Sequence, residues 1–515
     1  MRLLSFALLG CSSLPLIAAQ AGGGVGLLIS TAEGPVLGNR PVPRVRRWLG
    51  IPYASAARWQ PPGPAPSHSS TLSATSFGNS CPQLIGPAIA KYLEFAHQDE
   101  PLTEAEDCLT VNIWAPAKSR PQNTAVLVWM YGGGFQFGAS ALSVYDGQKF
   151  VEDNDDIIVV SFNYRLNIFG QPNAPQLVSP TNSQNFGLLD QRAAIEWIHN
   201  NIAAFGGDPN RITLAGHSAG GTGAGLYSLA YPTDTIVKGI IEQSGGIYGA
   251  ADLVSPTLDD ATWHTVADAV GCGSSPTSAQ FSCMQGKPWR DLVNAANDAG
   301  IVFFKLVTDE QLVFSDYETR MDNGQFLPVP ALIGNVVNEA NALTVALNLL
   351  IRGNSPPFLT TVIGEISSQV GGTCPTSKET QQRFDAGVPT WRYRYQAVFP
   401  GISVRSDLGA FHGSDIPIAF GTYRSIDPNP TSTQIGLSQT FQKAWVAFVR
   451  NPASGLTTYG WPQYNPSTDT LIQLGDRQNL SGASFGSPHL LDATCADLPA
   501  LMDLNAQFNA LLAGV

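Results

Sequence analysis

The chain has 515 residues, with 28 Lys or Arg and 40 Asp or Glu, which gives a formal net charge of −12. Because the acidic residues are scattered and nucleic-acid binding relies on basic patches, this composition argues against a nucleic-acid-binding protein. No proline- or serine-rich linker, charge block or internal repeat divides the sequence. We therefore expect one large domain over residues 22–515.

Residues 1–21 have the composition of a secretory signal peptide. Arg2 precedes two apolar runs that end in small residues, with cleavage expected after Ala19 or Ala21. Removal of Arg2 with this segment changes the net charge from −12 to −13. No later run approaches the ~18 consecutive apolar residues of a membrane-spanning helix. These features predict a secreted protein without a transmembrane segment.

The cysteine count fits this compartment. Seven cysteines occur, and because Cys11 lies in the signal segment, six remain in the mature chain. An even number in a secreted protein favours up to three disulfides, although many pairings are possible. Asn479-Leu-Ser481 is the one usable N-x-S/T sequon, so we expect Asn479 to carry a surface glycan.

A glycine-rich turn around one serine is the strongest chemical signal. Gly216-His217-Ser218-Ala219-Gly220 fits G-x-S-x-G, in which a strand turns sharply into a helix and exposes the serine. The preceding Ile212–Ala215 has the composition of a buried strand, and glycines flank the turn because a Cβ there would clash. The pattern predicts Ser218 as a nucleophile; the alternative is a turn with a buried structural serine.

A second glycine run follows the apolar strand expected at Thr124–Met130. The run is Tyr131-Gly-Gly-Gly134. A tetrahedral intermediate places negative charge on the former carbonyl oxygen, and backbone N–H groups approach that oxygen closely only where no side chain intervenes. The position of the glycines, after a buried strand and upstream of the serine, favours an oxyanion-binding loop over a flexible linker.

Strands and helices alternate along this part of the chain. Further strands are expected at 156–162, 237–241 and 330–334, and a helix is expected at 185–198. Such alternation is typical of a mostly parallel sheet with helices on both faces. The predicted class is therefore α/β.

Two more stretches resemble a known family. Gly50-Ile-Pro-Tyr-Ala54 and the run Glu106–Pro116, Glu-Asp-Cys-Leu-Thr-Val-Asn-Ile-Trp-Ala-Pro, resemble signatures of the type-B carboxylesterases, which include cholinesterases and fungal lipases. The resemblance extends from about Leu28 to the C-terminal region. It implies an α/β-hydrolase fold with helical insertions over the active site, and hydrolysis of a small-molecule or lipid ester without metal or cofactor.

A serine nucleophile needs a base, and the base needs a carboxylate that orients it. His412 lies in Gly409-Ala-Phe-His-Gly-Ser-Asp415, which matches the family's G-x-x-H-x-x-[DE] block and implies His412 as the base and Asp415 as a supporting carboxylate. His264 and His489 also follow Ser218, but no motif supports either.

The acid is implied in the same way. Glu339 ends Gly334-Asn-Val-Val-Asn-Glu, which matches the family's G-x-x-x-x-E, with Ala340 where glycine is usual. Glu365 is the alternative. The resemblance further implies the N–H groups of Gly133, Gly134 and Ala219 as oxyanion donors, and Ser244 as a supporting serine.

The resemblance also bears on His217 and on the disulfides. Glutamate usually occupies the position of His217 in the family, and we infer no catalytic role for this histidine. The family pattern pairs Cys81 with Cys108 and Cys272 with Cys283, which leaves Cys374 for Cys495.

The loop 81–108 distinguishes subclasses. In the resembling lipases it carries a mobile lid, and in the cholinesterases it carries a tryptophan that binds a quaternary ammonium group. No tryptophan occurs here, so a cholinesterase is disfavoured. One helical face is predicted to gather Ile85, Ile89, Tyr92, Leu93 and Ala96. The stripe fits a lid and a permanently docked helix equally well.

A non-catalytic binding protein is the rival from another functional class. The resembling family contains adhesion proteins that kept the fold and lost the serine. This chain has a residue of the required type at all three triad positions, which favours an enzyme. The sequence leaves the acyl and alcohol specificity and the oligomeric state open.

Overall fold

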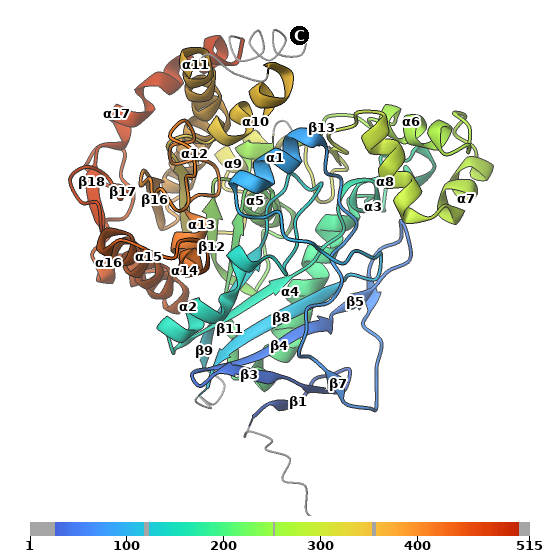
Figure 1. The fold of residues 1–515 in the computed structure, drawn as a ribbon, viewed down its shortest axis with the longest axis horizontal. Coiled ribbons are helices and arrows are strands. Elements are labelled where there is room, and N and C mark those ends of the chain that lie inside the picture. The colour runs from blue at the N-terminus through green and yellow to red at the C-terminus, as the bar shows by residue number, and fades with distance from the viewer. Residues whose placement is uncertain (1–25, 118–122, 251–252, 353–356, 504–515) are drawn as a thin grey trace, which may run out of the picture.

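The structure of the protein is a computed structural model that describes residues 26–117, 123–250, 253–352 and 357–503. The expected signal segment, residues 1–21, lies outside these ranges. The centre of the molecule is one 11-stranded sheet with helices packed around it (Figure 1).

The order of the strands in this sheet differs from their order in the chain. From one edge to the other the sheet contains β18 (Ala483–Gly486), β17 (Leu471–Leu474), β16 (Thr390–Tyr395), β15 (Ala331–Val336), β12 (Val237–Gln243), β11 (Gly207–His217), β9 (Thr124–Met130), β10 (Ile157–Phe162), β8 (Thr110–Pro116), β4 (Val45–Pro52) and β3 (Asn39–Val42).

The central strands of the sheet are parallel. Pairing is parallel from β10 through β9, β11, β12, β15 and β16 to β17. At the edges, β8, β4, β3 and β18 pair antiparallel. Strands covered on both faces are apolar along their whole length, and every residue of β9 and β10 is buried. The mostly parallel sheet confirms the predicted α/β-hydrolase fold class.

Helices provide most of the regular secondary structure outside this sheet. The longer ones are α1 (Pro87–Phe95), α2 (Gly147–Asp153), α4 (Phe186–Phe205), α5 (Ala219–Ala230), α6 (Ala261–Ala269), α7 (Ser278–Gly286), α8 (Trp289–Asp298), α10 (Asn341–Arg352), α11 (Pro357–Ser368), α12 (Cys374–Asp385) and α15 (Ser432–Arg450). The shorter ones are α3 (Asn167–Gly170), α9 (Tyr317–Asp322), α13 (Ile416–Phe420), α14 (Tyr423–Ile426), α16 (Gly455–Tyr459) and α17 (Pro488–Asp492).

Short strands form three small sheets beside the central one. These strands are β1 (Leu28–Ser30), β2 (Pro35–Leu37), β5 (Ala54–Ser55), β6 (Gly63–Pro64), β7 (Leu72–Ser73), β13 (Val254–Ser255) and β14 (Leu306–Val307).

Contacts at two positions of β12, Gly239 and Glu242, show that helices cover both faces of the sheet. A Cβ built on Gly239 would contact Phe448 of α15 at 3.2 Å, whereas a Cβ on Gly225 of α5 would contact Glu242 at 3.2 Å. Residues 239 and 242 point to opposite faces because side chains alternate along a strand. α15 and α5 therefore lie on opposite sides of β12, as expected for this class.

The helical insertions lie at the end of the sheet where β9, β11, β12 and β15 finish (Figure 1). α6, α7 and α8 form a separate small core around Trp263, Met284 and Leu292. Away from this small core, α1 packs against α10. The predicted apolar stripe of α1 is partly correct: Leu93 and Ala96 are buried, but so is Phe95, which the stripe omitted.

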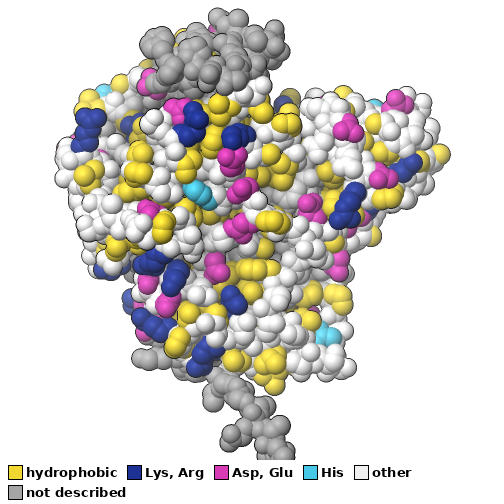
Figure 2. Space-filling view, in the orientation of Figure 1, with side chains coloured by type: hydrophobic (Ala, Val, Ile, Leu, Met, Phe, Trp, Pro, Cys, Tyr) yellow, Lys and Arg dark blue, Asp and Glu magenta, His cyan; other side chains and the backbone are white. Residues whose placement is uncertain are grey.

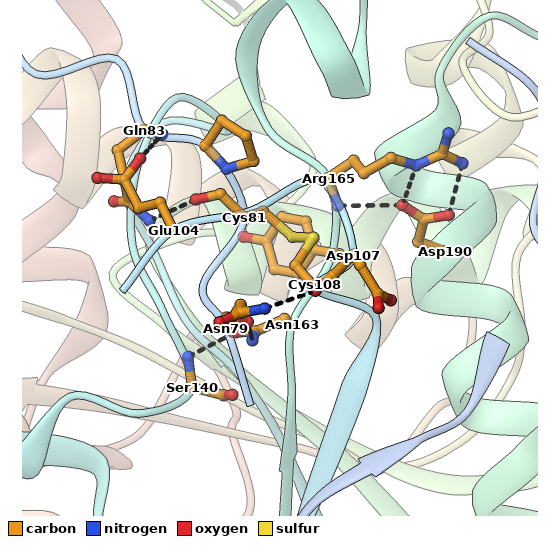
Figure 3. Close-up of a disulfide and its surroundings, with 12 residues drawn as sticks. Asn79, Cys81, Gln83, Glu104, Asp107, Cys108, Ser140, Asn163, Arg165 and Asp190 are labelled. Atoms are coloured by element: carbon orange, nitrogen blue, oxygen red, sulfur yellow. Dashed lines mark hydrogen bonds and ion pairs between the residues drawn. A yellow bond between two sulfur atoms is a disulfide. The ribbon is translucent and has the colours of Figure 1, made fainter. Parts of the chain in front are cut away.

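Three disulfides join Cys81 to Cys108, Cys272 to Cys283, and Cys374 to Cys495, the pairs expected from the sequence. The Cys81–Cys108 disulfide, which Figure 3 shows with its surroundings, closes the loop that contains α1. At the base of this loop, the Gln83 N–H donates to the Glu104 carboxylate at 2.9 Å, and the Gln83 side chain donates to the Cys81 carbonyl at 3.0 Å. The two ends of the loop are therefore held together where they leave the core.

The surface fits the scattered acidic composition. Figure 2 shows acidic and basic side chains interspersed over one face rather than gathered into a patch of one sign. Asn479 is exposed in the turn between β17 and β18. Its exposure is compatible with the expected glycan, which stays a prediction. Within the described ranges, none of the helices combines the length and apolar character that a membrane crossing requires.

Candidate active site

Ser218 occupies the tight turn between β11 and α5. Its φ of 54° and ψ of −124° are unfavourable for a side chain with a Cβ, and such strain is typical of functional positions. A Cβ on Gly216 would lie 2.2 Å from the Gly220 backbone, and one on Gly220 would lie 2.1 Å from the Met130 oxygen. Both positions therefore require glycine, for the steric reason that the pattern implied.

The turn is attached to the neighbouring strand. The Ser218 N–H donates to the Gln243 carbonyl at the end of β12, at 2.9 Å. The next residue, Ser244, has a φ of 48°, and its N–H donates to the Gly334 carbonyl of β15 at 2.7 Å. These bonds connect the ends of β11, β12 and β15. The Ser244 hydroxyl is buried without a hydrogen-bond partner among the described residues.

His412 and Glu339 come from two loops that pair directly with each other. His412 Nδ1 lies 2.5 Å from Glu339 Oε2, and Glu339 Oε1 accepts the Val336 N–H at 2.8 Å. Beside them, the Asn338 N–H donates to the Ala410 carbonyl, and the Ala410 N–H donates to Asn338 Oδ1, both at 3.0 Å. When Nδ1–H is held by a carboxylate, the other ring nitrogen is free to accept a proton.

Contacts around the turn bring the three segments together. The ring of His217, next to Ser218, lies 4.4 Å from the ring of His412, centroid to centroid. A Cβ on Gly132 would lie 2.8 Å from the Ser218 Cβ. The glycine loop, the serine turn and the His412 loop therefore meet at one place.

The glycine loop has a backbone that other residues rarely adopt. Gly133 has a φ of 113°, and a Cβ there would lie 2.0 Å from the Phe137 oxygen. A Cβ on Gly134 would contact Phe303 at 3.0 Å. Ala219 is the first residue of α5, and the N–H groups that begin a helix have no acceptor within it. Ala219 directly follows Ser218, and Gly133 and Gly134 follow Gly132, whose backbone lies against the serine turn.

The alternatives to this arrangement lie elsewhere. Glu365 is an exposed residue of α11. His264 lies in α6, 3.7 Å from Asp260, and His489 lies in the short helix α17. The substitution at Ala340 is accommodated because this residue does not have a positive φ, and its N–H donates to Ser368 at 3.1 Å.

Asp415 is fully buried at the start of α13. Burial, together with the nearby charge of Glu339, raises the pKa of its carboxyl group to about 7. Asp415 is thus a carboxyl group that carries a proton at mildly acidic pH.

A pH dependence of stability follows from this carboxyl group. Because its pKa is higher in the folded protein than the ~4 of an unfolded aspartate, the folded state binds more protons, and stability falls as pH rises from ~4 to ~7. We expect Asp415→Asn to raise the free energy of unfolding by up to about 4 kcal/mol at pH 8 and to have little effect at pH 4. Urea unfolding of both proteins at the two pH values measures this; an equal difference at both would contradict it.

The structure adds two contacts that the sequence did not indicate. The Tyr92 hydroxyl of α1 donates to the His412 carbonyl at 3.1 Å. Burial, followed by the charges of Glu339 and Asp415, raises the pKa of Tyr92, so its hydroxyl remains a donor. Phe303, which is 37% exposed, lies against the Gly134 position. Tyr92 was predicted only as part of the apolar stripe of its helix, and Phe303 has no sequence signal apart from being aromatic.

Comparison with known proteins gives the family. A profile of the carboxylesterase family matches residues 26–354 and 352–485. The chain belongs to the carboxylesterase family. This carboxylesterase is therefore a carboxylic ester hydrolase of type B.

Named relatives are similar over nearly the whole chain. The carboxylesterase is 33% identical to a secreted lipase 5 of Gibberella zeae over 500 residues, 88% of this chain and 90% of the relative. It is 32% identical to a chlorogenic acid esterase of Aspergillus niger over 487 residues, 87% and 90% of the two chains. It is 28% identical to a para-nitrobenzyl esterase of Bacillus subtilis over 481 residues, 86% and 94%.

Proposed function

We propose that this carboxylesterase is a secreted serine hydrolase that cleaves carboxylic esters through Ser218, His412 and Glu339. The observation that carries the proposal is the 2.5 Å contact between His412 Nδ1 and Glu339 Oε2, made by two paired loops beside the serine turn. A carboxylate, an imidazole and a strained serine that meet in this way form the constellation needed for acyl transfer.

In this mechanism Ser218 Oγ attacks the ester carbonyl carbon while His412 Nε2 takes the hydroxyl proton. Glu339 holds Nδ1–H, which fixes the ring and stabilises the imidazolium. The tetrahedral intermediate collapses when the C–O bond to the alcohol breaks and His412 returns the proton to the leaving oxygen. Water then attacks the acyl-enzyme with the same base, which releases the acid and restores Ser218.

The backbone N–H groups of Gly133, Gly134 and Ala219 would bind the oxyanion in both intermediates. The position of this glycine loop against the serine turn supports the assignment. Fixed donors at the oxygen where charge develops stabilise the transition state more than the ground state, which is the source of the rate enhancement.

Secretion rests on three separate features. Residues 1–21 have a signal-peptide composition, the chain contains three disulfides, and one relative is named a secreted lipase. Disulfides form and persist in oxidising compartments, which the secretory route provides.

A series of p-nitrophenyl esters with acyl chains from acetyl to palmitoyl tests the activity. We expect hydrolysis of at least the short-chain members, with saturation kinetics and complete inhibition by a serine-directed organophosphate. The chain-length preference would define the acyl specificity, which the fold leaves open. Failure to hydrolyse any member of the series with folded protein would favour the non-catalytic binding role.

The pH profile provides a further prediction. Because the base must be neutral to accept the serine proton, we expect kcat/KM to fall on acidification through one transition. Initial rates with a soluble short-chain ester between pH 5 and 8 measure this profile. A flat profile in protein that stays folded would argue against His412 as the base.

A lipase with a lid is the second candidate, and the position of α1 favours considering it. α1 packs on α10 and bonds the His412 carbonyl through Tyr92, so its movement would reach the base directly. A cavity of about 220 Å³ lies beneath it, lined in part by Leu93 and Phe137. Against a lid, His97 Nε2 donates a hydrogen bond to the Ile402 carbonyl at 3.1 Å, which helps to fix the end of the helix.

Kinetics at the solubility limit separate the two candidates. If α1 is a lid, activity on a triglyceride rises sharply once the substrate exceeds its solubility, and Ile89→Asp blunts this rise while sparing hydrolysis of a soluble ester. Leu480→Asp, at an apolar residue exposed elsewhere, is the matched control. Smooth saturation across the limit, with Ile89→Asp unfolding the protein, would mean a fixed helix and an ordinary carboxylesterase.

A further inference from the structure

His217 lies beside the nucleophile and is enclosed by the protein. Its side chain is 2% exposed, and neither ring nitrogen has a hydrogen-bond partner among the described residues. Its ring packs on the ring of His412 at 4.4 Å with an angle of 43° between the planes. Burying an imidazole whose nitrogens have no hydrogen-bond partner lowers the stability of the fold, which points to a functional role for His217.

Two glycines allow the ring to lie there. A Cβ on Gly132 would be 3.0 Å from His217 Nδ1, and a Cβ on Gly413 would be 3.5 Å from His217 Cε1. Backbone therefore closes the ring on both sides, and substrate does not reach it in this arrangement. Its ring contact with His412 is therefore the route by which we expect it to act on the reaction.

The charged groups around these two rings decide what that effect is. Titratable groups near His412 are its bonded carboxylate Glu339, the buried Asp415, and the phenols Tyr92 and Tyr393. Burial, and then the positive charge that His412 gains, hold the pKa of His217 well below its usual range. His217 is therefore neutral when His412 becomes an imidazolium.

We propose that His217 is a positioning residue for the base: a neutral imidazole that backs the His412 ring and leaves Glu339 as the carboxylate in contact with it. The proposal rests on the proposed function of His412. A carboxylate at position 217, the usual residue in the family, would place a second negative charge against the imidazolium and hold its proton more tightly. His217 thus keeps the base neutral, and the esterase active, at a lower pH than a carboxylate would allow.

Two substitutions test this effect. We expect His217→Glu to move the midpoint of the acid limb of kcat/KM upward by on the order of one pH unit, with kcat on the alkaline plateau reduced much less. His217→Gln keeps a neutral polar side chain of similar reach and should leave the midpoint within ~0.3 pH unit. If both variants had the same midpoint, the charge at position 217 would not act on His412, and the proposal would be overturned.

A direct titration does not depend on activity or on the charge state of an introduced glutamate. In the proton–carbon NMR spectrum of histidine-labelled protein, the ring signal that disappears in His217→Gln identifies His217. We expect this signal not to titrate between about pH 8 and 5, while the signal assigned through His412→Gln does. A His217 ring that takes up a proton in this range would refute the neutral role, whereas full activity of His412→Gln would refute the proposed function instead.

Discussion

Ser218→Ala is expected to lower kcat by on the order of 10³-fold or more while leaving the protein folded. The substitution removes the atom that forms the acyl-enzyme. It keeps the Cβ, so the positive φ and the close contacts of Gly216 and Gly220 are unchanged. The loss should therefore appear in catalysis and not in the unfolding temperature.

Ser228→Ala is the matched control for this variant. Ser228 lies in the same helix, α5, and its hydroxyl donates to the Gly225 carbonyl at 2.7 Å. Removing that hydroxyl should leave kcat within ~2-fold, with at most the ~1 kcal/mol destabilisation of a lost hydrogen bond. Near-wild-type turnover by pure Ser218→Ala protein would end the mechanism as written.

Glu339→Gln should lower kcat by about 10³- to 10⁴-fold, because it replaces the carboxylate of the triad by an amide. The amide can present N–H where Glu339 Oε2 now accepts, which favours the wrong tautomer of His412 and removes the negative charge that stabilises the imidazolium. The side chain keeps its size and packing against Gly372. Single-turnover kinetics with a chromogenic ester measure the loss at the acylation step.

Glu365→Gln makes the same chemical change at the other carboxylate that the sequence offered. Because Glu365 is exposed on α11, this variant should hydrolyse the ester at the wild-type rate. If the two effects were exchanged, with Glu339→Gln active and Glu365→Gln inactive, the acid would have to be reassigned.

The central part of the fold was predictable because its strands are buried on both faces. Thr124–Met130 is apolar at nearly every position, and it forms β9 with the predicted bounds. The turn at Ser218 was equally visible, since the close approach of Gly220 to the Met130 backbone leaves only glycine possible. Local sterics and burial determine both features, and local sequence records them.

Contacts between distant segments were not predictable in the same way. Nothing within the sequence around Tyr92 indicates that its hydroxyl bonds the backbone of His412, 320 residues later. The packing of His217 on His412 likewise depends on how two loops meet, although the departure from the family's glutamate marked position 217 as unusual. The antiparallel edges of the sheet were also missing from the prediction, because strand direction follows from topology and not from composition.

Labelling with a fluorophosphonate tests the central claim most directly, because the probe reacts only with an activated serine. We expect the folded protein to be modified at Ser218, as mapped by peptide mass spectrometry, with labelling lost in Ser218→Ala and after denaturation. Labelling should also fall steeply in Glu339→Gln protein that is shown to be folded. Folded wild-type protein that stays unlabelled at Ser218, or that is labelled at another serine, would contradict the proposed active site.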